Sequence, residues 1–300
     1  MFNPKWYHTL TILLLLPFSI IYAIAMWIRR KIVIRKKFEV PIISVGNLIV
    51  GGSGKTPFTI ALAARYDDVY IISRGYGRQS EGLIEVSRRG RILTDVKQSG
   101  DEPMLMAISL PHASVIVSED RHKAITLAQK NGAKLIMLDD GFNRVEIEKF
   151  EIVLEPNEIK NFFPFPAGPF REFWFSKKYA DIVAKEGRDF FREVRIVDPT
   201  SRMLLITAIS NPQRLDPFLP EGVVQKIYLP DHDYFDEEEI RRLMNEGSAQ
   251  SILCTSKDRV KMEGFKLPIS EMKLKLEIND AVLKRVDTYI RNSMETMKVK

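Results

Sequence analysis

The longest apolar run of the chain lies near its N-terminus. The nineteen residues from Leu10 to Ile28 carry no formal charge, and as a helix they would extend over roughly 28 Å, close to the hydrocarbon thickness of a bilayer. Only Lys5 precedes this run, whereas a basic cluster follows it, made of Arg29, Arg30, Lys31, Arg35, Lys36 and Lys37. The run predicts a membrane helix, and the positive-inside rule predicts that the chain after it lies in the cytoplasm.

The geometry of this helix stays open between a span of the bilayer and a position in its interface. Pro17, Ser19 and Tyr22 interrupt the apolar run, which weakens the case for a simple straight span. A buried core helix is a third alternative. A cleaved signal peptide fits less well, because its basic region should precede the apolar run. In either membrane geometry the basic cluster is expected to bind anionic head groups.

After residue 38 the pattern changes to short apolar runs that alternate with segments of helical periodicity. Strands are predicted over residues 40–45, 69–73, 113–117, 134–140 and 151–154, and helices over 56–66 and 121–131. Such alternation is typical of an α/β fold in which a mostly parallel sheet is flanked by helices on both faces.

A Phe- and Pro-rich segment over residues 161–175 is predicted to be an irregular loop or hinge. Beyond it, strands are expected over 180–184, 192–197, 203–209, 225–229 and 251–256, and helices over 236–246 and near the C-terminus. The prediction therefore has three parts: an N-terminal membrane anchor with a basic collar (1–38), a larger α/β domain (39–175) and a smaller C-terminal α/β domain (176–300).

The composition narrows the classes of partner. The chain has 300 residues, 45% of them hydrophobic, so it can bury a sizeable core. Its single cysteine, Cys254, excludes an internal disulfide framework and a cysteine-rich zinc cluster. The net charge of +6 favours an anionic partner. Because much of this charge follows the apolar run and no nucleic-acid-binding motif is present, we expect anionic lipid or a phosphorylated substrate, no nucleic acid, and no obligate protein partner.

A glycine-rich loop, SVGNLIVGGSGKTP over residues 44–57, connects the first predicted strand to the first predicted helix. Glycines let backbone N–H groups approach an anion closely, and the helix N-terminus favours negative charge. Lys55 is expected to reach the β- and γ-phosphates, and Thr56 to ligate magnesium. Ile49 stands where the strict motif has glycine, so the loop is a variant. The residues expected to bind the nucleotide are Gly51, Gly52, Ser53, Gly54, Lys55 and Thr56.

Two aspartates, Asp139 and Asp140, end the apolar run over 134–140. A carboxylate at the end of a neighbouring strand is the usual second half of a phosphoryl-transfer site, where it holds Mg²⁺ directly or through water. A simple turn is the alternative explanation for such a pair. Together with the loop, the pair predicts a P-loop NTPase-like domain that uses ATP and Mg²⁺, without separating a kinase from an ATPase or a GTPase.

Seven motifs together resemble one known family. They are the glycine-rich loop, SRGYG (73–77), GDEP (100–103), LDDGF (138–142), PAGPFRE (166–172), DHDY (231–234) and TSKD (255–258). Their order is similar to that in tetraacyldisaccharide 4′-kinases, the lipid A kinases of Gram-negative bacteria. The resemblance implies ATP-dependent phosphorylation of the 4′-hydroxyl of a tetraacylated glucosamine disaccharide 1-phosphate, at the cytoplasmic face of the inner membrane.

The resemblance also implies roles for individual residues. Asp101 and His232 match a catalytic pair, in which either group takes the proton of the sugar hydroxyl; Lys55 and Arg121 are further catalytic candidates. Without the resemblance, Asp101 would equally suit a turn, and His232 or Arg121 an ordinary surface position. The implied substrate-binding residues are Arg74, Tyr76, Asn143, Arg144, Arg171 and Glu172.

One departure from the family pattern concerns the two residues after LDDGF. The family usually carries Gln and His there, whereas this chain has Asn143 and Arg144, a shorter amide and a permanent cation. Substrate contacts at these positions are therefore expected to differ. The alternative function is a membrane-associated P-loop NTPase switch without lipid phosphorylation, although TSKD lacks the asparagine of a base-reading NKxD motif.

Overall fold

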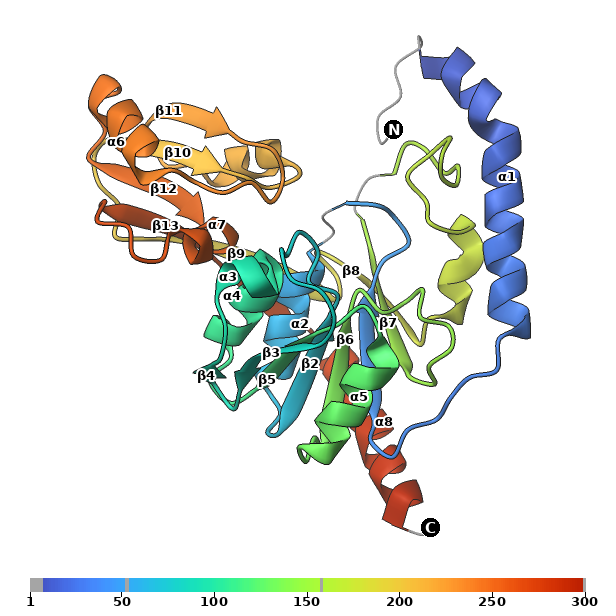
Figure 1. The fold of residues 1–300 in the computed structure, drawn as a ribbon. Helices are drawn as coiled ribbons and strands as arrows, with labels where there is room; N and C mark the ends of the chain where they lie inside the picture. The colour runs from blue at the N-terminus through green and yellow to red at the C-terminus, as the bar shows by residue number, and fades with distance from the viewer. Residues whose placement is uncertain (1–7, 52–53, 157–158, 299–300) are drawn as a thin grey trace.

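The computed structural model of the protein describes residues 8–51, 54–156 and 159–298. It has an α/β architecture with two sheets (Figure 1). The larger sheet has eight strands in the order β4-β3-β5-β2-β6-β1-β7-β8. Their bounds are β1 Ile42–Gly46, β2 Val69–Ser73, β3 Ile84–Arg88, β4 Arg91–Ile92, β5 Ser114–Val117, β6 Leu135–Asp139, β7 Phe150–Glu155 and β8 Ile182–Lys185.

Neighbouring strands are parallel from β5 to β8 across this sheet, and β3 and β4 form an antiparallel edge. Every residue of β1, β2, β5 and β6 is buried, which is the reason why these strands read as continuous apolar runs. Helices α2 (Lys55–Ala63), α4 (Asp101–Ser109) and α8 (Asp280–Lys298) pack on one face, and α5 (Arg121–Lys130) packs on the other. The predicted parallel sheet with helices on both faces is confirmed.

The smaller sheet has five strands in the order β11-β10-β12-β13-β9. It forms a separate layer at the upper left of Figure 1, with helix α6 (Glu237–Glu246) packed on one face. Antiparallel strands β9 and β13 are shared between the two parts, because Phe190 and Ile278 belong to the core of the larger sheet and Val194 and Met272 to that of the smaller one. The bounds are β9 Phe190–Val197, β10 Met203–Thr207, β11 Val223–Tyr228, β12 Ser251–Thr255 and β13 Ile269–Ile278.

The larger sheet extends past residue 175, where the sequence predicted the second domain to begin. Strand β8 pairs with β7 in the larger sheet, and α8 returns to the same sheet and buries Val282, Leu283 and Val286 there. The 161–175 segment is mostly irregular, and its last two residues begin the short 3-10 helix η2 (Trp174–Tyr179). The physical reason for the difference is tertiary pairing, which local sequence patterns do not specify.

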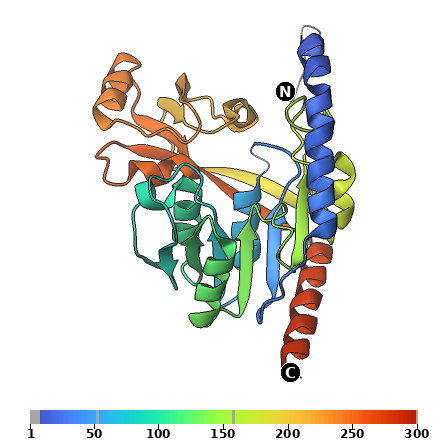
Figure 2. The same cartoon turned by 45° about the vertical axis from the view of Figure 1, so that its right-hand side comes forward.

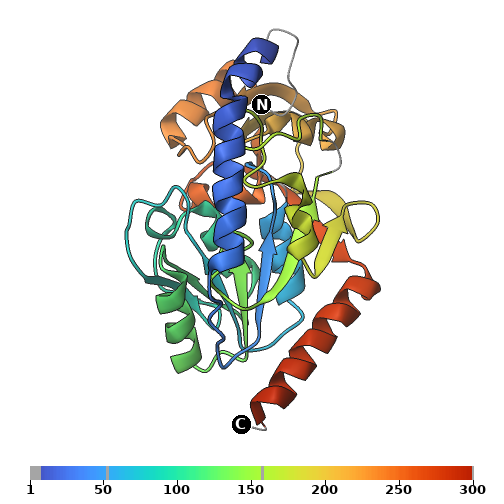
Figure 3. The same cartoon turned by 90° about the vertical axis from the view of Figure 1, so that its right-hand side faces the viewer.

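Helix α1 (Thr9–Ile32) is the one helix in the described part of the chain that is long and apolar enough to cross a membrane. It runs along the outside of the larger sheet (Figures 2 and 3). Ser19, Ala23 and Arg30 form its buried face, and Ser19 Oγ accepts a hydrogen bond of 2.8 Å from the backbone N–H of Ala167. The opposite face exposes large apolar side chains, including Leu10, Leu13, Leu14, Phe18 and Ile21.

A buried ion pair fastens the C-terminal end of α1 to the domain. Arg30 Nη2 and Nε donate to the two carboxylate oxygens of Glu172 at 2.7 and 3.0 Å, and both side chains are only 3% exposed. Arg30 also donates to the carbonyl oxygen of Phe142 and lies 4.4 Å from the centre of its ring. Glu172, predicted to bind substrate, is thus fully engaged with α1, and its carboxylate has no open face toward a ligand.

We expect Arg30→Ala to lower the free energy of unfolding by about 3–5 kcal/mol, because it leaves the Glu172 carboxylate buried without a counter-charge. Arg29→Ala is the matched control, since Arg29 is 40% exposed and pairs with the partly exposed Glu146; it should cost about 0–1 kcal/mol. Urea unfolding in detergent would measure both. Equal losses for the two variants would contradict this account of the α1 contact.

Candidate active site

The glycine-rich loop leaves the end of β1 and enters α2, as the sequence predicted. Gly54, at the N-cap of α2, has φ +80°, a left-handed conformation that favours glycine. Lys55 Nζ lies 3.3 Å from Asn47 Oδ1 and 3.6 Å from Asp140 Oδ1, so the ammonium group points back across the loop. Thr56 lies in the first turn of α2. Of the predicted nucleotide-binding residues, Gly52 and Ser53 lie outside the described residues.

The aspartates end β6 between β1 and β2, the position at which ligands bind in open parallel sheets. Asp139 Oδ2 accepts a hydrogen bond of 3.2 Å from Ser73 Oγ, at the end of β2. Asp139 Oδ1 is buried and, among the described residues, receives no hydrogen bond. Burial, followed by the charge of Glu102, raises the pKa of Asp139 to about 7. A buried carboxylate oxygen without a donor is suited to a cation.

Asp140 has cationic neighbours on two sides. Its Oδ2 accepts a hydrogen bond of 2.8 Å from Arg171 Nη1, and its Oδ1 faces Lys55. Burial alone would raise the pKa of Asp140, but the charges of Lys55 and Arg171 outweigh it and hold the pKa below its ordinary value. The residue adopts φ +52°, an uncommon conformation for a non-glycine residue, which sites of function often contain. Asp140 is therefore ionised and held in place.

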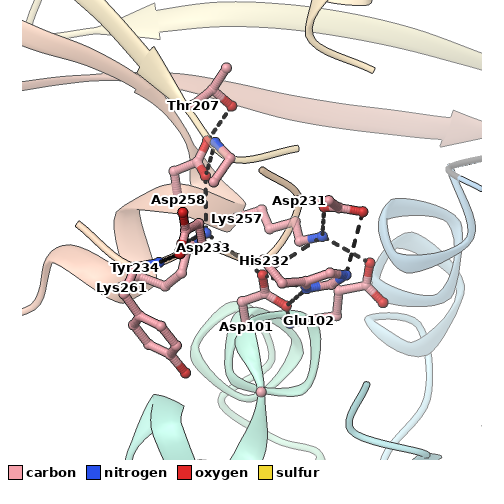
Figure 4. A network of polar contacts seen from close by, with 12 residues as sticks. Asp101, Glu102, Thr207, Asp231, His232, Asp233, Tyr234, Lys257, Asp258 and Lys261 are labelled. Carbon is pink, nitrogen blue, oxygen red and sulfur yellow. Dashed lines mark hydrogen bonds and ion pairs between the residues drawn. The ribbon is translucent and has the colours of Figure 1, made fainter. Parts of the chain in front are cut away.

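The structure brings Asp101 and His232 together from sequence positions 131 residues apart. His232 Nδ1 lies 2.9 Å from both carboxylate oxygens of Asp101 (Figure 4). Asp101 lies in the first turn of α4 and is 4% exposed. His232 follows strand β11, has φ +67° and donates its backbone N–H to Ala208. The imidazole and the carboxylate thus form a directly bonded pair from the two parts of the protein.

Two lysines that the sequence analysis did not single out complete this cluster. Lys257 Nζ lies 3.3 Å from Asp231, 3.4 Å from Glu102 and 3.7 Å from Asp101. Lys261 is nearly inaccessible, and its Nζ lies 3.8 Å from Asp101. Burial works to raise the pKa of Asp101, but the hydrogen bond from His232 and the charges of the two lysines hold the pKa below its ordinary value.

The TSKD motif also positions the histidine through the backbone. Asp258 accepts hydrogen bonds from Thr207 Oγ1 at 2.6 Å and from the N–H of Ala208 at 3.0 Å. The carbonyl oxygen of Ala208 in turn accepts the N–H of His232 at 3.1 Å. In the sequence, the signal for this role is the motif itself, which resembles that of the family, although the sequence alone assigns no function to its lysine or its aspartate.

The remaining predicted site residues surround the strand ends at different depths. Arg121 is buried, donates to the carbonyl oxygens of Ser73 and Ser118 through Nη1, and has its pKa lowered by burial to about 10. Arg74 and Tyr76 are exposed, and the Tyr76 ring lies 5.1 Å from that of His232. Asn143 and Arg144 are half-buried, and Arg144 contributes to lowering the pKa of Arg121.

A pocket of about 230 Å³ opens beside the glycine-rich loop and lies between the two sheets. Its walls are mainly apolar, but cationic side chains line it from both parts of the protein. Glu102, next to Asp101, also lines the pocket and so connects it to the Asp101–His232 pair. The charged side chains that line it are Lys55, Glu102, Arg192, Arg214 and Lys257.

Comparison with known proteins decides the family. The sequence profile described as Tetraacyldisaccharide-1-P 4′-kinase matches residues 11–196 and 191–291. The chain belongs to the tetraacyldisaccharide 4′-kinase family. It is 46% identical over 291 residues to the tetraacyldisaccharide 4′-kinase of Helicobacter pylori (strain J99), covering 96% of this chain and 93% of that protein. The Aliarcobacter butzleri protein of the same name is 44% identical, and the match covers 97% of this chain and 96% of that protein.

A solved structure supports the same assignment. The chain is similar to LpxK from Aquifex aeolicus, crystallised in complex with ATP, with a TM-score of 0.76 and 29% identity over 93% of this chain and 99% of that one. The resemblance inferred from the seven motifs is thereby confirmed, and this member of the tetraacyldisaccharide 4′-kinase family is a kinase with the family's α/β fold.

The protonation of Asp139 gives a test that needs no substrate. Because its pKa of about 7 exceeds the ordinary value of about 3.9, the folded state binds one proton more than the unfolded state between these values. The contribution to stability is complete at low pH and is lost as the pH rises through 7. Without metal or nucleotide, we therefore expect the Tm of Asp139→Asn to rise relative to that of the wild type between pH 5 and 8. A pH-independent difference would contradict the assignment.

Proposed function

We propose that this protein transfers the γ-phosphoryl group of ATP to the 4′-hydroxyl of a tetraacylated glucosamine disaccharide 1-phosphate, a step of lipid A biosynthesis. The observation that carries the proposal is the Asp101–His232 pair beside a glycine-rich phosphate loop, because phosphorylation of a hydroxyl needs a group that accepts its proton. The names of the relatives supply the identity of the acceptor.

The reaction is an in-line displacement at phosphorus. The 4′-oxygen forms a new bond to the γ-phosphorus as the bond from that phosphorus to the bridging oxygen breaks, and ADP leaves. The Asp101–His232 pair accepts the hydroxyl proton as one unit, since its two members share a hydrogen bond. Lys55 stabilises the negative charge of the transferring phosphoryl group. Arg121 is a buried cation that donates a hydrogen bond to the carbonyl oxygen of Ser73.

We further propose that Mg²⁺ binds between the nucleotide and this site. The orphaned Asp139 Oδ1 and the hydroxyl of Thr56 would hold the ion, with water and phosphate oxygens completing its ligands. Bound there, the ion would neutralise charge on the phosphates. Asp140, predicted as a ligand, is instead engaged by Lys55 and Arg171, so its part is to fix these two cations.

The acceptor is proposed to lie over the exposed side of the pair. Tyr76 flanks His232 from the loop after β2, and Arg74 lies in the same loop. Arg171, Asn143 and Arg144 lie near the end of β6. Arginine side chains suit the phosphate and hydroxyl groups of a sugar phosphate.

The lipid substrate gives α1 its proposed role. With its buried face fixed to the domain by Ser19 and Arg30, α1 would present its exposed leucine-rich face to the membrane interface at the cytoplasmic side of the inner membrane. The exposed members of its basic collar, such as Lys31 and Arg35, would bind anionic lipid there.

The test of the acceptor uses purified protein in detergent with ATP, Mg²⁺ and the tetraacyldisaccharide 1-phosphate, compared with the same lipid lacking its 4′-hydroxyl. We expect phosphorylation of the first lipid and none of the second, because the second offers no nucleophile. Equal phosphorylation of both lipids would assign the reaction to another hydroxyl and contradict the proposal.

A further inference from the structure

A second cationic group lies against the phosphate loop, and it comes from the opposite wall of the pocket. Arg192 is on β9, in the ribbon that β9 and β13 form between the two sheets. A methyl group placed on Gly54, at the N-cap of α2, would lie 3.0 Å from Arg192 Nη2. The side chain therefore reaches the start of the helix whose N-terminus is expected to face the nucleotide phosphates.

The orientation of Arg192 follows from strand alternation. Arg192 and Val194 both line the pocket, whereas Phe191, Glu193 and Arg195 on the other face of β9 are exposed. The side chain is 13% exposed. A largely buried arginine on the pocket side is unlike the solvated arginine at 195, and it requires anionic or hydrogen-bonding partners.

The described residues satisfy this guanidinium only in part. Arg192 Nη2 lies 3.2 Å from Glu186 Oε2. Arg192 Nε is buried and donates no hydrogen bond to any of the described residues. A guanidinium has five N–H donors in a fixed plane, so a single carboxylate leaves some of these donors unused.

The surrounding charge favours an anion with several negative charges. The pocket is lined by four cationic side chains, Lys55, Lys257, Arg192 and Arg214, and by the acidic side chain of Glu102. Burial, and then the positive charge of Arg192, lower the pKa of Arg214. An anionic group between these cations would relieve their mutual repulsion.

We propose that Arg192 binds the terminal phosphates of ATP, so that the nucleotide is held by Lys55 on one wall of the pocket and by the β9 ribbon on the other. The inference rests on the proposed function only in taking ATP as the nucleotide. Phosphate oxygens would accept hydrogen bonds from the N–H groups of Arg192 that Glu186 leaves unused, because the planar guanidinium can bind a phosphate through two parallel hydrogen bonds. Arg192 is then a nucleotide-binding residue supplied by the connection between the two sheets.

The test is nucleotide binding by calorimetry, with full-length protein, Mg²⁺ and no lipid. Arg192→Met should bind ATP roughly 10- to 100-fold more weakly, the usual loss for a hydrogen-bonded charge, and should bind AMP with little change. Arg195→Met is the matched control on the exposed face of the same strand, and it should bind ATP as the wild type does. Unchanged ATP binding by Arg192→Met, or an equal loss for ATP and AMP, would overturn the proposal.

Two further variants guard against a folding defect. Arg192→Lys keeps the charge and should lose less ATP affinity than Arg192→Met. Glu186→Gln removes the carboxylate that competes for Arg192, and it should bind ATP at least as tightly as the wild type. If Glu186→Gln instead weakens ATP binding as much as Arg192→Met does, the pair only supports the ribbon and the inference fails.

The outcomes separate this inference from the proposed function. A wild-type protein that binds ATP through Arg192 but leaves the lipid unmodified contradicts the kinase proposal alone. If the wild-type protein phosphorylates the lipid and the Arg192→Met variant binds ATP as tightly as the wild type does, only the inference about Arg192 is contradicted.

Discussion

Asp101→Asn is expected to lower kcat by about 10²- to 10⁴-fold, the usual worth of a positioned proton acceptor. The amide keeps the shape of the carboxylate but removes its negative charge. In the wild type, His232 Nδ1 lies 2.9 Å and Lys257 Nζ 3.7 Å from the carboxylate oxygens. The KM for ATP should change little, because the side-chain hydrogen bonds and ion pairs of Asp101 within the described residues go to Glu102, His232, Lys257 and Lys261 and not to Lys55. Steady-state kinetics with saturating lipid would measure both constants.

Asp233→Asn is the matched control, since it makes the same chemical change one residue from His232 at an exposed position. It should keep kcat close to the wild-type value. The double variant Asp101→Asn with His232→Gln should be no slower than the slower single variant, because the two groups act as a unit. If the two losses multiply instead, the side chains work independently and the pair is not the proton acceptor.

Lys55→Met is the second large change, with an expected loss in kcat of roughly 10³-fold, comparable to the removal of one donor that stabilises transition-state charge. Methionine preserves much of the side chain's length while deleting the charge that lies 3.6 Å from Asp140 and 3.3 Å from Asn47. The measurement is single-turnover transfer at saturating ATP, which separates the chemical step from nucleotide binding.

Lys130→Met, in the last turn of α5 and exposed, is the control for Lys55→Met and should transfer phosphate at the wild-type rate. A circular dichroism spectrum and a Tm close to those of the wild type would show that the Lys55→Met variant is folded. A folded Lys55→Met protein with undiminished single-turnover transfer would contradict the role given to this lysine.

The parts of the fold that the sequence predicted are those with strong local signals. The parallel strands of the larger sheet are continuous apolar runs, and α1 is a long uncharged segment followed by basic residues. Strand β13 was not assigned, although its residues alternate in burial over much of their length, as a strand with one covered face should. For Asp101 the sequence leaves a turn as the alternative to catalysis, whereas Asp101 begins α4, with acidic residues in the first turn, where they interact favourably with the helix dipole.

Long-range contacts account for what the sequence could not predict. Nothing local to residues 182–185 or 280–298 indicates that β8 and α8 return to the larger sheet, because both depend on pairing and packing across the fold. The same holds for the site. Asp101 and His232 were recognised as candidates through their motifs, but Lys261 and Arg192 look like ordinary charges in the sequence, and only their burial separates them from solvated residues.

The fate of the γ-phosphate of ATP is the most direct test of phosphoryl transfer to the lipid. Purified protein would be incubated with γ-labelled ATP, Mg²⁺ and the tetraacyldisaccharide 1-phosphate, and the label in lipid and in inorganic phosphate would be counted against the ADP formed. We expect one labelled lipid for each ADP, and little release of phosphate when the lipid is left out. Label that appears in inorganic phosphate while the lipid stays unlabelled would identify a nucleotide-hydrolysing switch and contradict the kinase.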